Sequence, residues 1–308
     1  MKKNPILVKI IFAALILICL SGVVSSPFAL ILGFLFTLII GQPFEKFTQL
    51  GIQYLLKISV VGLGFGMLLT ETLKTGREGL VITVLTIFGT LTLGWFFTKL
   101  LKIDLHLGYL ISAGTSICGG SAIAAVAPVI LAKPKTISVA LGVVFLLNSI
   151  ALFVFPGIGH FLSMTQHEFG LWAAVAIHDT SSVVGAALTY GDEALRVATT
   201  VKLSRTLWII PVSLVSMLLF KTKDGKIKIP WFILFFIIAI LINSYIILPA
   251  VLTGFITGAS KRLLIVTIFL VGSTLSVQDL KKTGTKPFVL GVILWICISI
   301  FSLLFIMN

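Results

Sequence analysis

Apolar runs long enough to cross a lipid bilayer follow one another along almost the whole chain. A bilayer-spanning helix needs about 20 consecutive apolar residues, because each residue advances the helix by only about 1.5 Å. Of the 308 residues, 58% are hydrophobic and 11% are charged, so the chain cannot cover a water-facing surface of ordinary size, and a soluble globular enzyme is excluded. The runs lie at residues 5–23, 27–41, 50–69, 80–97, 105–131, 136–155, 170–190, 194–220, 230–248, 251–275 and 288–307.

These runs are continuous and lack the alternation of barrel strands, which favours helices as the spanning elements. We therefore expect an all-α polytopic membrane protein with about nine to eleven transmembrane helices. The linkers leave no room for an extramembrane domain, so residues 1–308 are expected to form a single transmembrane domain, with the helices of residues 1–49 peripheral to its core. Cleavage of the first run as a signal peptide is the alternative for the N-terminus.

The composition also limits which ligands and partners the protein is expected to bind. Cys19, Cys118 and Cys297 are odd in number and lie inside apolar runs, so they do not predict a disulfide framework. The formal net charge of +13 comes from Lys and Arg scattered through short linkers, which indicates membrane topology and no nucleic acid. No metal-binding helix motif or phosphate-binding loop is present in the sequence, so we expect no metal and no cofactor.

Basic residues in the linkers predict the orientation. Residues 221–228 carry four lysines and should be cytoplasmic, whereas residues 160–168 carry no Lys or Arg and should be external. If every run crossed the bilayer once, Lys133 and Lys135 would face outward and the Lys-free loop inward. We therefore expect the runs at 105–131 and 170–190 to be broken or re-entrant.

Two internal similarities predict inverted repeats. Residues 120–125 (GSAIAA) match 181–186 (SSVVGA) in size and polarity, and each sextet lies in one of the two unusual runs. Residues 65–74 (FGMLLTETLK) resemble 272–281 (GSTLSVQDLK), each at the end of a run. Inverted repeats with broken helices are typical of alternating-access transporters whose binding site lies near the bilayer midplane.

The most informative polar stretch inside an apolar run is GTSICGGSAIAAVAP, at residues 114–128. Each glycine costs a helix roughly 1 kcal/mol, so we expect a break near Cys118-Gly119-Gly120. A helix that restarts at Ser121 would point free backbone N–H groups into the interior, which favours an anion. The alternative is that the small residues only allow close helix packing. The anion-site interpretation assigns binding roles to Ser116, Cys118, Gly119, Gly120 and Ser121.

A second stretch, AIHDTSSVVGAA at residues 176–187, places a carboxylate deep inside an apolar run. A charge at the bilayer centre costs about 2.5–3.5 kcal/mol, so Asp179 is a candidate functional group, either as a proton carrier or as the partner of a cation. His178, Ser181 and Ser182 lie beside it and are candidate ligands. The alternative is that Asp179 caps the helix that follows.

Lys202 and Arg205 are three residues apart and therefore share one face of an apolar helix. They either extend to the membrane interface or turn inward, where they would pair with Asp179 or line an anion site. Asn148 is a weaker candidate, for an interhelical hydrogen bond.

These three stretches resemble the YeiH-like family of bacterial inner-membrane proteins, whose members are commonly labelled as sulfate exporters. The resemblance extends from about Leu50 to the C-terminus, and the Ser-Ile-Cys-Gly of residues 116–119 is its most specific element. Family members usually have Gly-Ala in place of Gly119-Gly120, a difference that preserves the break. The resemblance implies transport of a small anion and a relation to ion-coupled carriers with crossed broken helices.

We therefore expect a secondary transporter, not an enzyme, in the bacterial cytoplasmic membrane. Its substrate would be sulfate, a sulfonate or a small carboxylate, and its transport would be coupled to a proton or a sodium ion. The sequence leaves open whether the protein forms a homo-oligomer. A passive anion channel is the nearest competing function. A membrane-embedded hydrolase using Ser121, His178 and Asp179 is more distant, because neighbouring His and Asp residues on one backbone seldom point at each other.

Overall fold

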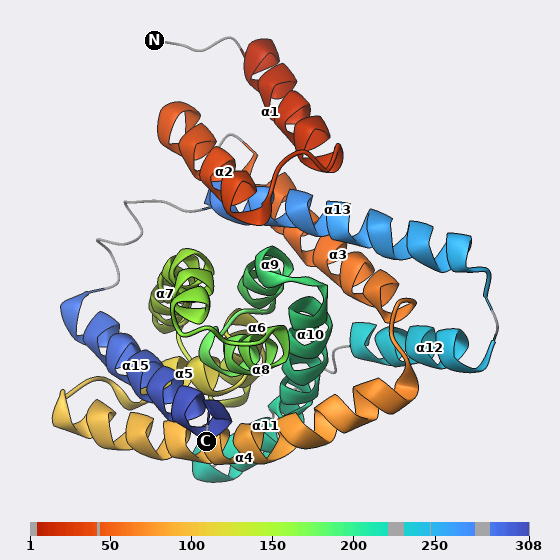
Figure 1. The fold of residues 1–308 in the computed structure, drawn as a ribbon. Helices are drawn as coiled ribbons and strands as arrows, with labels where there is room; N and C mark the ends of the chain where they lie inside the picture. Colours follow the sequence, from red (N-terminus) through yellow and green to blue (C-terminus); the bar gives the residue numbers. More distant parts are fainter. Residues whose placement is uncertain (1–4, 42–43, 221–230, 247, 275–283, 308) are drawn as a thin grey trace. The chain divides into compact units, whose positions relative to one another are not determined.

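The computed structural model describes residues 5–41, 44–220, 231–246, 248–274 and 284–307, and within these ranges the chain is helical and contains no strand (Figure 1). The helices are α1 (Pro5–Leu20), α2 (Ser26–Ile40), α3 (Glu45–Gly64), α4 (Leu69–Leu100), α5 (Leu105–Ser116), α6 (Gly120–Val129), α7 (Pro134–Phe161), α8 (Gln166–Ala176), α9 (Thr180–Tyr190), α10 (Asp192–Leu207), α11 (Ile209–Phe220), α12 (Phe232–Tyr245), α13 (Ala250–Thr274) and α15 (Thr285–Met307).

Each predicted apolar run contains helix, and the all-α polytopic prediction is confirmed. Among the described residues, five continuous or nearly continuous helical stretches are long and apolar enough to cross a membrane by themselves: Leu69–Leu100, Pro134–Phe161, Asp192–Phe220, Ala250–Thr274 and Thr285–Met307. Several helices extend beyond their apolar run, α4 most clearly, because the polar residues that precede the run continue the helix at its N-terminal end.

Both predicted breaks are present. The run at 105–131 divides into α5 and α6, and the run at 170–190 divides into α8 and α9. The similar sextets at 120–125 and 181–186 occupy equivalent places, because each lies in the helix that begins directly after a break. The other predicted similarity lies partly outside the described residues, and the lysine-rich loop at 221–228 lies wholly outside them.

A third interruption was not predicted. The run at 194–220 divides at Trp208, whose N–H donates to the carbonyl of Arg205 at 3.0 Å. Trp208 keeps a right-handed backbone conformation, so the interruption does not leave helical geometry. Pro211 explains the interruption, because it has no N–H to continue the hydrogen-bond ladder.

The chain forms two compact units. The first contains residues 1–69 and 231–276, and the second contains residues 70–230 and 277–308. In the first unit, α2 and α13 approach so closely that a Cβ on Gly33 would collide with the carbonyl oxygen of Phe269, and one on Gly272 with that of Leu30. Glycines at a helix contact allow this backbone approach, as in other membrane helix pairs.

The second unit contains both broken segments, with α4, α7, α10 and α15 packed around them (Figure 1). Small residues again bring helices together: Gly94 of α4 lies against Ser112 of α5, and Gly108 of α5 lies against Thr98 of α4. On α15, the indole N–H of Trp295 donates to the carbonyl of Ala176 at 3.1 Å, at the C-terminal end of α8. These contacts hold the two breaks inside one unit.

Candidate functional site

The first break separates α5 from α6 and depends on a glycine. Gly119 has φ +62° and ψ −122°, a conformation that side-chain-bearing residues rarely adopt. Its N–H donates to the carbonyl of Gly114 at 2.8 Å, which closes the end of α5, and α6 begins at the next residue, Gly120. The predicted break near Cys118-Gly119-Gly120 is therefore confirmed.

The second break separates α8 from α9 and depends on a cap. The Asp179 carboxylate accepts hydrogen bonds from the backbone N–H groups of Ser181 (3.0 Å) and Ser182 (3.4 Å) and from the Ser181 hydroxyl. These N–H groups belong to the first turn of α9 and have no partner within the helix. Asp179 is therefore the N-cap of α9, as the helix-cap alternative predicted.

The two breaks touch each other. A Cβ on Gly119 would lie 3.3 Å from both the N and the Cα of Asp179, so only a residue without a side chain fits easily there. Asn148 of α7 joins the second break, since its Oδ1 accepts from the backbone N–H groups of His178 (2.9 Å) and Asp179 (3.2 Å). One turn earlier on α7, Val144 packs against the Gly119 position. Helix α7 thus supports both breaks, and the predicted interhelical role of Asn148 is confirmed.

Lys202 of α10 is completely buried and joins the ends of both broken helices. Its Nζ donates to the carbonyl oxygens of Ile117 at 3.1 Å, Ala174 at 3.2 Å and Ile177 at 2.7 Å. The first of these oxygens follows the C-terminal end of α5, and the other two lie at the C-terminal end of α8. A cation suits this place, because helix C-termini carry partial negative charge.

Arg205 lies one turn further along α10 and is also completely buried. Its guanidinium donates to the carbonyl oxygen of Ser116 at 2.5 Å and to the Thr86 hydroxyl of α4 at 2.8 Å. Both cations therefore turn inward and do not extend to the membrane interface.

The expected ion pair between Asp179 and one of these cations is absent; among the described residues, the ion pairs within 4.0 Å involve only His167, Arg196 and three glutamates. The reason is that each charge already has a backbone partner. The carboxylate is used by the N-terminal end of α9, and the cations are used by the C-terminal ends of α5 and α8.

Several buried polar atoms at the breaks have no hydrogen-bond partner in the described part of the chain. They are both ring nitrogens of His178, Nδ2 of Asn148 and Nε of Arg205. His178 is 0% exposed and Asn148 is 2% exposed, so bulk water does not reach them. An unpartnered buried polar group is costly, and such groups usually indicate a ligand, an ordered water or a functional role.

The remaining predicted residues have different environments. Ser181, Ser182 and Cys118 are buried, and the Ser116 hydroxyl donates to the carbonyl of Ala113 at 3.1 Å. Ser121 is exposed on α6, so its side chain does not belong to the buried cluster. This placement differs from the interior position expected for Ser121, whose binding role stays a prediction.

Sequence reasoning missed Thr86, which accepts from Arg205. A signal for it exists in the sequence. Thr83, Thr86 and Thr90 recur on one face of the apolar helix α4, and all three are buried. A hydroxyl stripe of this kind on a membrane helix marks the face that packs against polar groups.

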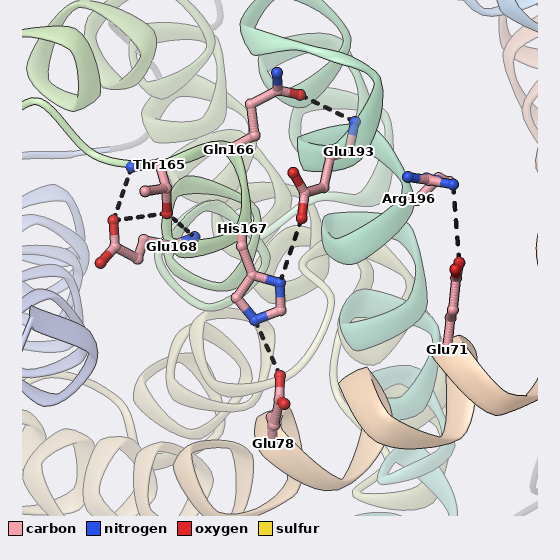
Figure 2. A network of polar contacts seen from close by, with 8 residues as sticks. All are labelled: Glu71, Glu78, Thr165, Gln166, His167, Glu168, Glu193 and Arg196. Carbon is pink, nitrogen blue, oxygen red and sulfur yellow. Dashed lines mark hydrogen bonds and ion pairs between the residues drawn. The ribbon is translucent and has the colours of Figure 1, made fainter.

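A second polar cluster lies at the opposite end of α8 and is exposed (Figure 2). His167 lies 2.9 Å from a carboxylate oxygen of Glu78 and 4.0 Å from one of Glu193. Arg196 lies 3.8 Å from Glu71. Helix α8 itself begins with a capping box, in which Thr165 and Glu168 satisfy each other's backbone N–H groups. The hydrogen bonds from the Thr165 side chain and backbone lower the pKa of the Glu168 carboxyl below its ordinary value.

Together these features define a multi-pass α-helical membrane protein in which two broken helices touch at their interruptions. The chain belongs to the family described as conserved hypothetical protein 698, whose model matches residues 6–291. It is 53% identical over 289 residues to a UPF0324 membrane protein of Bacteroides thetaiotaomicron, covering 93% of this chain and 87% of that protein.

Two further relatives extend the comparison. The chain is 51% identical over 297 residues to a UPF0324 membrane protein of Photobacterium profundum, covering 96% of this chain and 91% of that protein. It is 43% identical over 292 residues to one from Geobacter sulfurreducens, covering 95% and 94%. The resemblance to the YeiH-like family and the multi-pass membrane localisation are confirmed. No solved structure matches the chain.

Proposed function

We propose that this protein is a secondary transporter of a small anion, with its binding site at the contact between the two breaks. The observation that carries the proposal is the pair of buried cations, Lys202 and Arg205, which have no carboxylate partner among the described residues. They lie in the same unit as buried donors for which the described part of the chain offers no acceptor.

The charge balance around the breaks supports an anionic substrate. Two full positive charges face two helix C-terminal ends, which carry about half a negative charge each. Asp179 adds one negative charge, and the N-terminal ends of α6 and α9 add about half a positive charge each. About one positive charge therefore remains in an interior where an uncompensated charge is costly. A monovalent anion would cancel it.

The unpartnered atoms support the same class of substrate. The Nδ2 of Asn148 and the Nε of Arg205 are donors, and a neutral His178 ring offers one donor and one acceptor. A ligand rich in acceptors, such as a sulfonate, a carboxylate or an oxyanion, fits this inventory better than a ligand rich in donors. We therefore assign substrate contacts to His178, Asn148 and Arg205.

The broken helices favour a carrier, whose binding site rearranges during transport, over a channel with a permanent pore. Discontinuous helices place backbone groups at membrane depth and allow the parts on either side of a break to rearrange around a bound ligand. The unpartnered atoms are also closed off from bulk solvent, as expected for a carrier in an occluded state. Counterflow in proteoliposomes at a clamped membrane potential would distinguish a carrier from an anion channel. A carrier couples the entry of labelled substrate to the exit of unlabelled substrate, whereas a channel only lets the label equilibrate.

A melting screen of the purified protein tests the proposal directly, since a ligand that binds only the folded state raises its stability. The compounds are sulfate, methanesulfonate, acetate and related small anions at constant ionic strength. We expect at least one to raise the melting temperature with saturation, and Arg205→Gln to remove that response. Arg196→Gln is the matched control, because Arg196 lies on the same helix but is exposed. Failure of every anion to bind, with the folded protein intact, would contradict the proposal.

The role of Asp179 is tested separately. As a proton carrier it would be needed for pH-driven uptake, whereas as a helix cap it would be replaceable by another capping residue. Asp179→Ser keeps a capping oxygen and removes the charge. We expect Asp179→Ser to fold normally and to retain anion exchange at fixed pH but lose pH-driven uptake. Normal pH-driven uptake in this variant would leave Asp179 with the capping role alone.

A further inference from the structure

The three oxygens that surround the Lys202 ammonium come from backbone carbonyls of two separate segments. Ile117 follows α5, whereas Ala174 and Ile177 lie at the end of α8, and all three accept from the same Nζ within 3.2 Å. A shell of backbone carbonyls is how proteins hold monovalent cations out of water. The distances of 2.7–3.2 Å exceed the about 2.3–2.6 Å of calcium sites, so the shell suits a large monovalent cation.

The breaks leave these carbonyls without another hydrogen-bond partner in the described part of the chain, so a buried donor has to reach them. The last four carbonyls of a helix have no donor within the helix, and a left-handed residue that follows often allows backbone N–H groups to satisfy some of them. The residue after α8, Ile177, is instead extended, with φ −94° and ψ 124°. Two helix ends with partial negative charge would also repel each other where they converge. Lys202 removes both problems with a single ammonium group.

We infer that the C-terminal ends of α5 and α8 form a monovalent-cation site that the chain fills with its own Lys202 ammonium. Lys202 is thus a positioning residue that holds the two breaks together, and its three N–H donors are used by the three carbonyls. A dissolved sodium ion does not bind at this place in the native protein, because the tethered ammonium already occupies it. The inference does not depend on the proposed transport of an anion.

Chemical rescue tests this site. Lys202→Ala removes three methylene groups and the ammonium, which is the size of propylammonium. We expect the variant to melt roughly 10 °C or more below the native protein in detergent. Propylammonium should restore at least half of that loss with saturation, and ammonium or potassium should restore less. The native protein should not respond to any of these ions.

Two controls separate a filled site from a general salt effect. Tetramethylammonium carries the same charge without an N–H donor and should not restore Lys202→Ala. Lys202→Met fills the space without a charge, so it should be destabilised and should not respond to propylammonium. Rescue of Lys202→Ala by tetramethylammonium to the same extent would overturn the inference, as would native stability of Lys202→Ala without any added cation.

A variant that does not accumulate still allows a test. Lys202→Ala can be produced in cells supplied with propylamine, which crosses membranes as the neutral amine, and the yield of folded protein is compared with and without it. Lys202→Gln keeps N–H donors but lacks the charge, and we expect it to be less stable than Lys202→Arg. A Lys202→Gln protein as stable as the native one would show that the site needs no cation. Anion binding by the native protein is measured independently, so failure of one proposal does not imply failure of the other.

Discussion

Helix α10 carries two arginines that are held in opposite ways. Arg196 is about half exposed and faces the Glu71 carboxylate at 3.8 Å, whereas Arg205 is completely buried and donates to a carbonyl and a hydroxyl. The same contrast separates the two ends of α8, with the His167 contacts of Figure 2 at one end and Lys202 at the other. Water screens the exposed pairs, so they contribute little, while the buried cations must find partners inside the protein.

The comparison shows what a broken helix provides. A continuous helix has no free carbonyls in its middle, so it cannot stabilise a cation at membrane depth. Each break exposes a C-terminal end for a cation and an N-terminal end for a carboxylate. Lys202, Arg205 and Asp179 use these ends, which explains why oppositely charged residues in one unit do not pair with each other.

The largest expected difference in stability is between substitutions of Arg205 and of Arg196. Arg205→Met should lower the stability by roughly 3 kcal/mol, because it leaves the Ser116 carbonyl and the Thr86 hydroxyl buried without this partner. Arg196→Met should change it by less than about 0.5 kcal/mol, as expected for an exposed pair. Melting of both variants in the same detergent measures the difference. Equal losses of stability in the two variants would mean that burial does not determine how much each arginine contributes to stability.

The next prediction concerns the support that α7 gives to the second break. Asn148→Leu should cost about 1–3 kcal/mol, because the N–H groups of His178 and Asp179 lose their common acceptor. Ser149→Ala, at the exposed neighbouring position, should be nearly neutral, since its hydroxyl only donates to the carbonyl of Phe145 one turn earlier. Thermal unfolding of the purified variants checks this. An unaffected Asn148→Leu protein would show that α7 does not hold the break.

The first break should depend on Gly119 more than on Gly120. Gly119→Ala introduces a side chain at φ +62° against the Asp179 backbone and should cost roughly 1–2 kcal/mol. Gly120 begins a regular helix, and a Cβ there would meet the outer end of the Phe145 ring, which can move. Gly120→Ala should therefore be tolerated. Melting temperatures of the two variants, and their binding of whichever anion stabilises the native protein, measure the difference. A larger loss in Gly120→Ala than in Gly119→Ala would contradict the assignment of the break to Gly119.

The smallest effect is expected in the exposed cluster. Glu78→Gln removes the carboxylate that contacts His167, and it should change stability by less than about 1 kcal/mol. The effect should also shrink as salt is added, because surface charges are screened within about 10 Å at 0.1 M. Melting curves at low and high salt test this. A large, salt-independent loss would indicate that the exposed cluster is as important to stability as the buried one.

The two breaks were predictable because they depend on local chemistry. Consecutive glycines after Cys118 and a carboxylate followed by hydroxyl residues disfavour a continuous helix wherever they occur in an apolar run. The interruption at Trp208 was missed although Pro211 signals it, because a proline in the first turn of a helix is easily accommodated. The exposed position of Ser121 depends on which face of α6 packs inward, and a short apolar helix does not reveal that face.

The sequence alone determined that this protein is a multi-pass helical membrane protein and where two of its apolar segments, 105–131 and 170–190, are interrupted, because hydrophobic length and helix propensity act within one segment. Only the tertiary structure decided that the interruptions touch, that Lys202 and Arg205 turn inward, and that they bind backbone carbonyls and not Asp179. The physical reason is that a free carbonyl or N–H carries no residue-specific signal. Its presence at a helix end can be inferred from the chain, but the side chain that satisfies it comes from a helix many residues away, and only packing brings the two together.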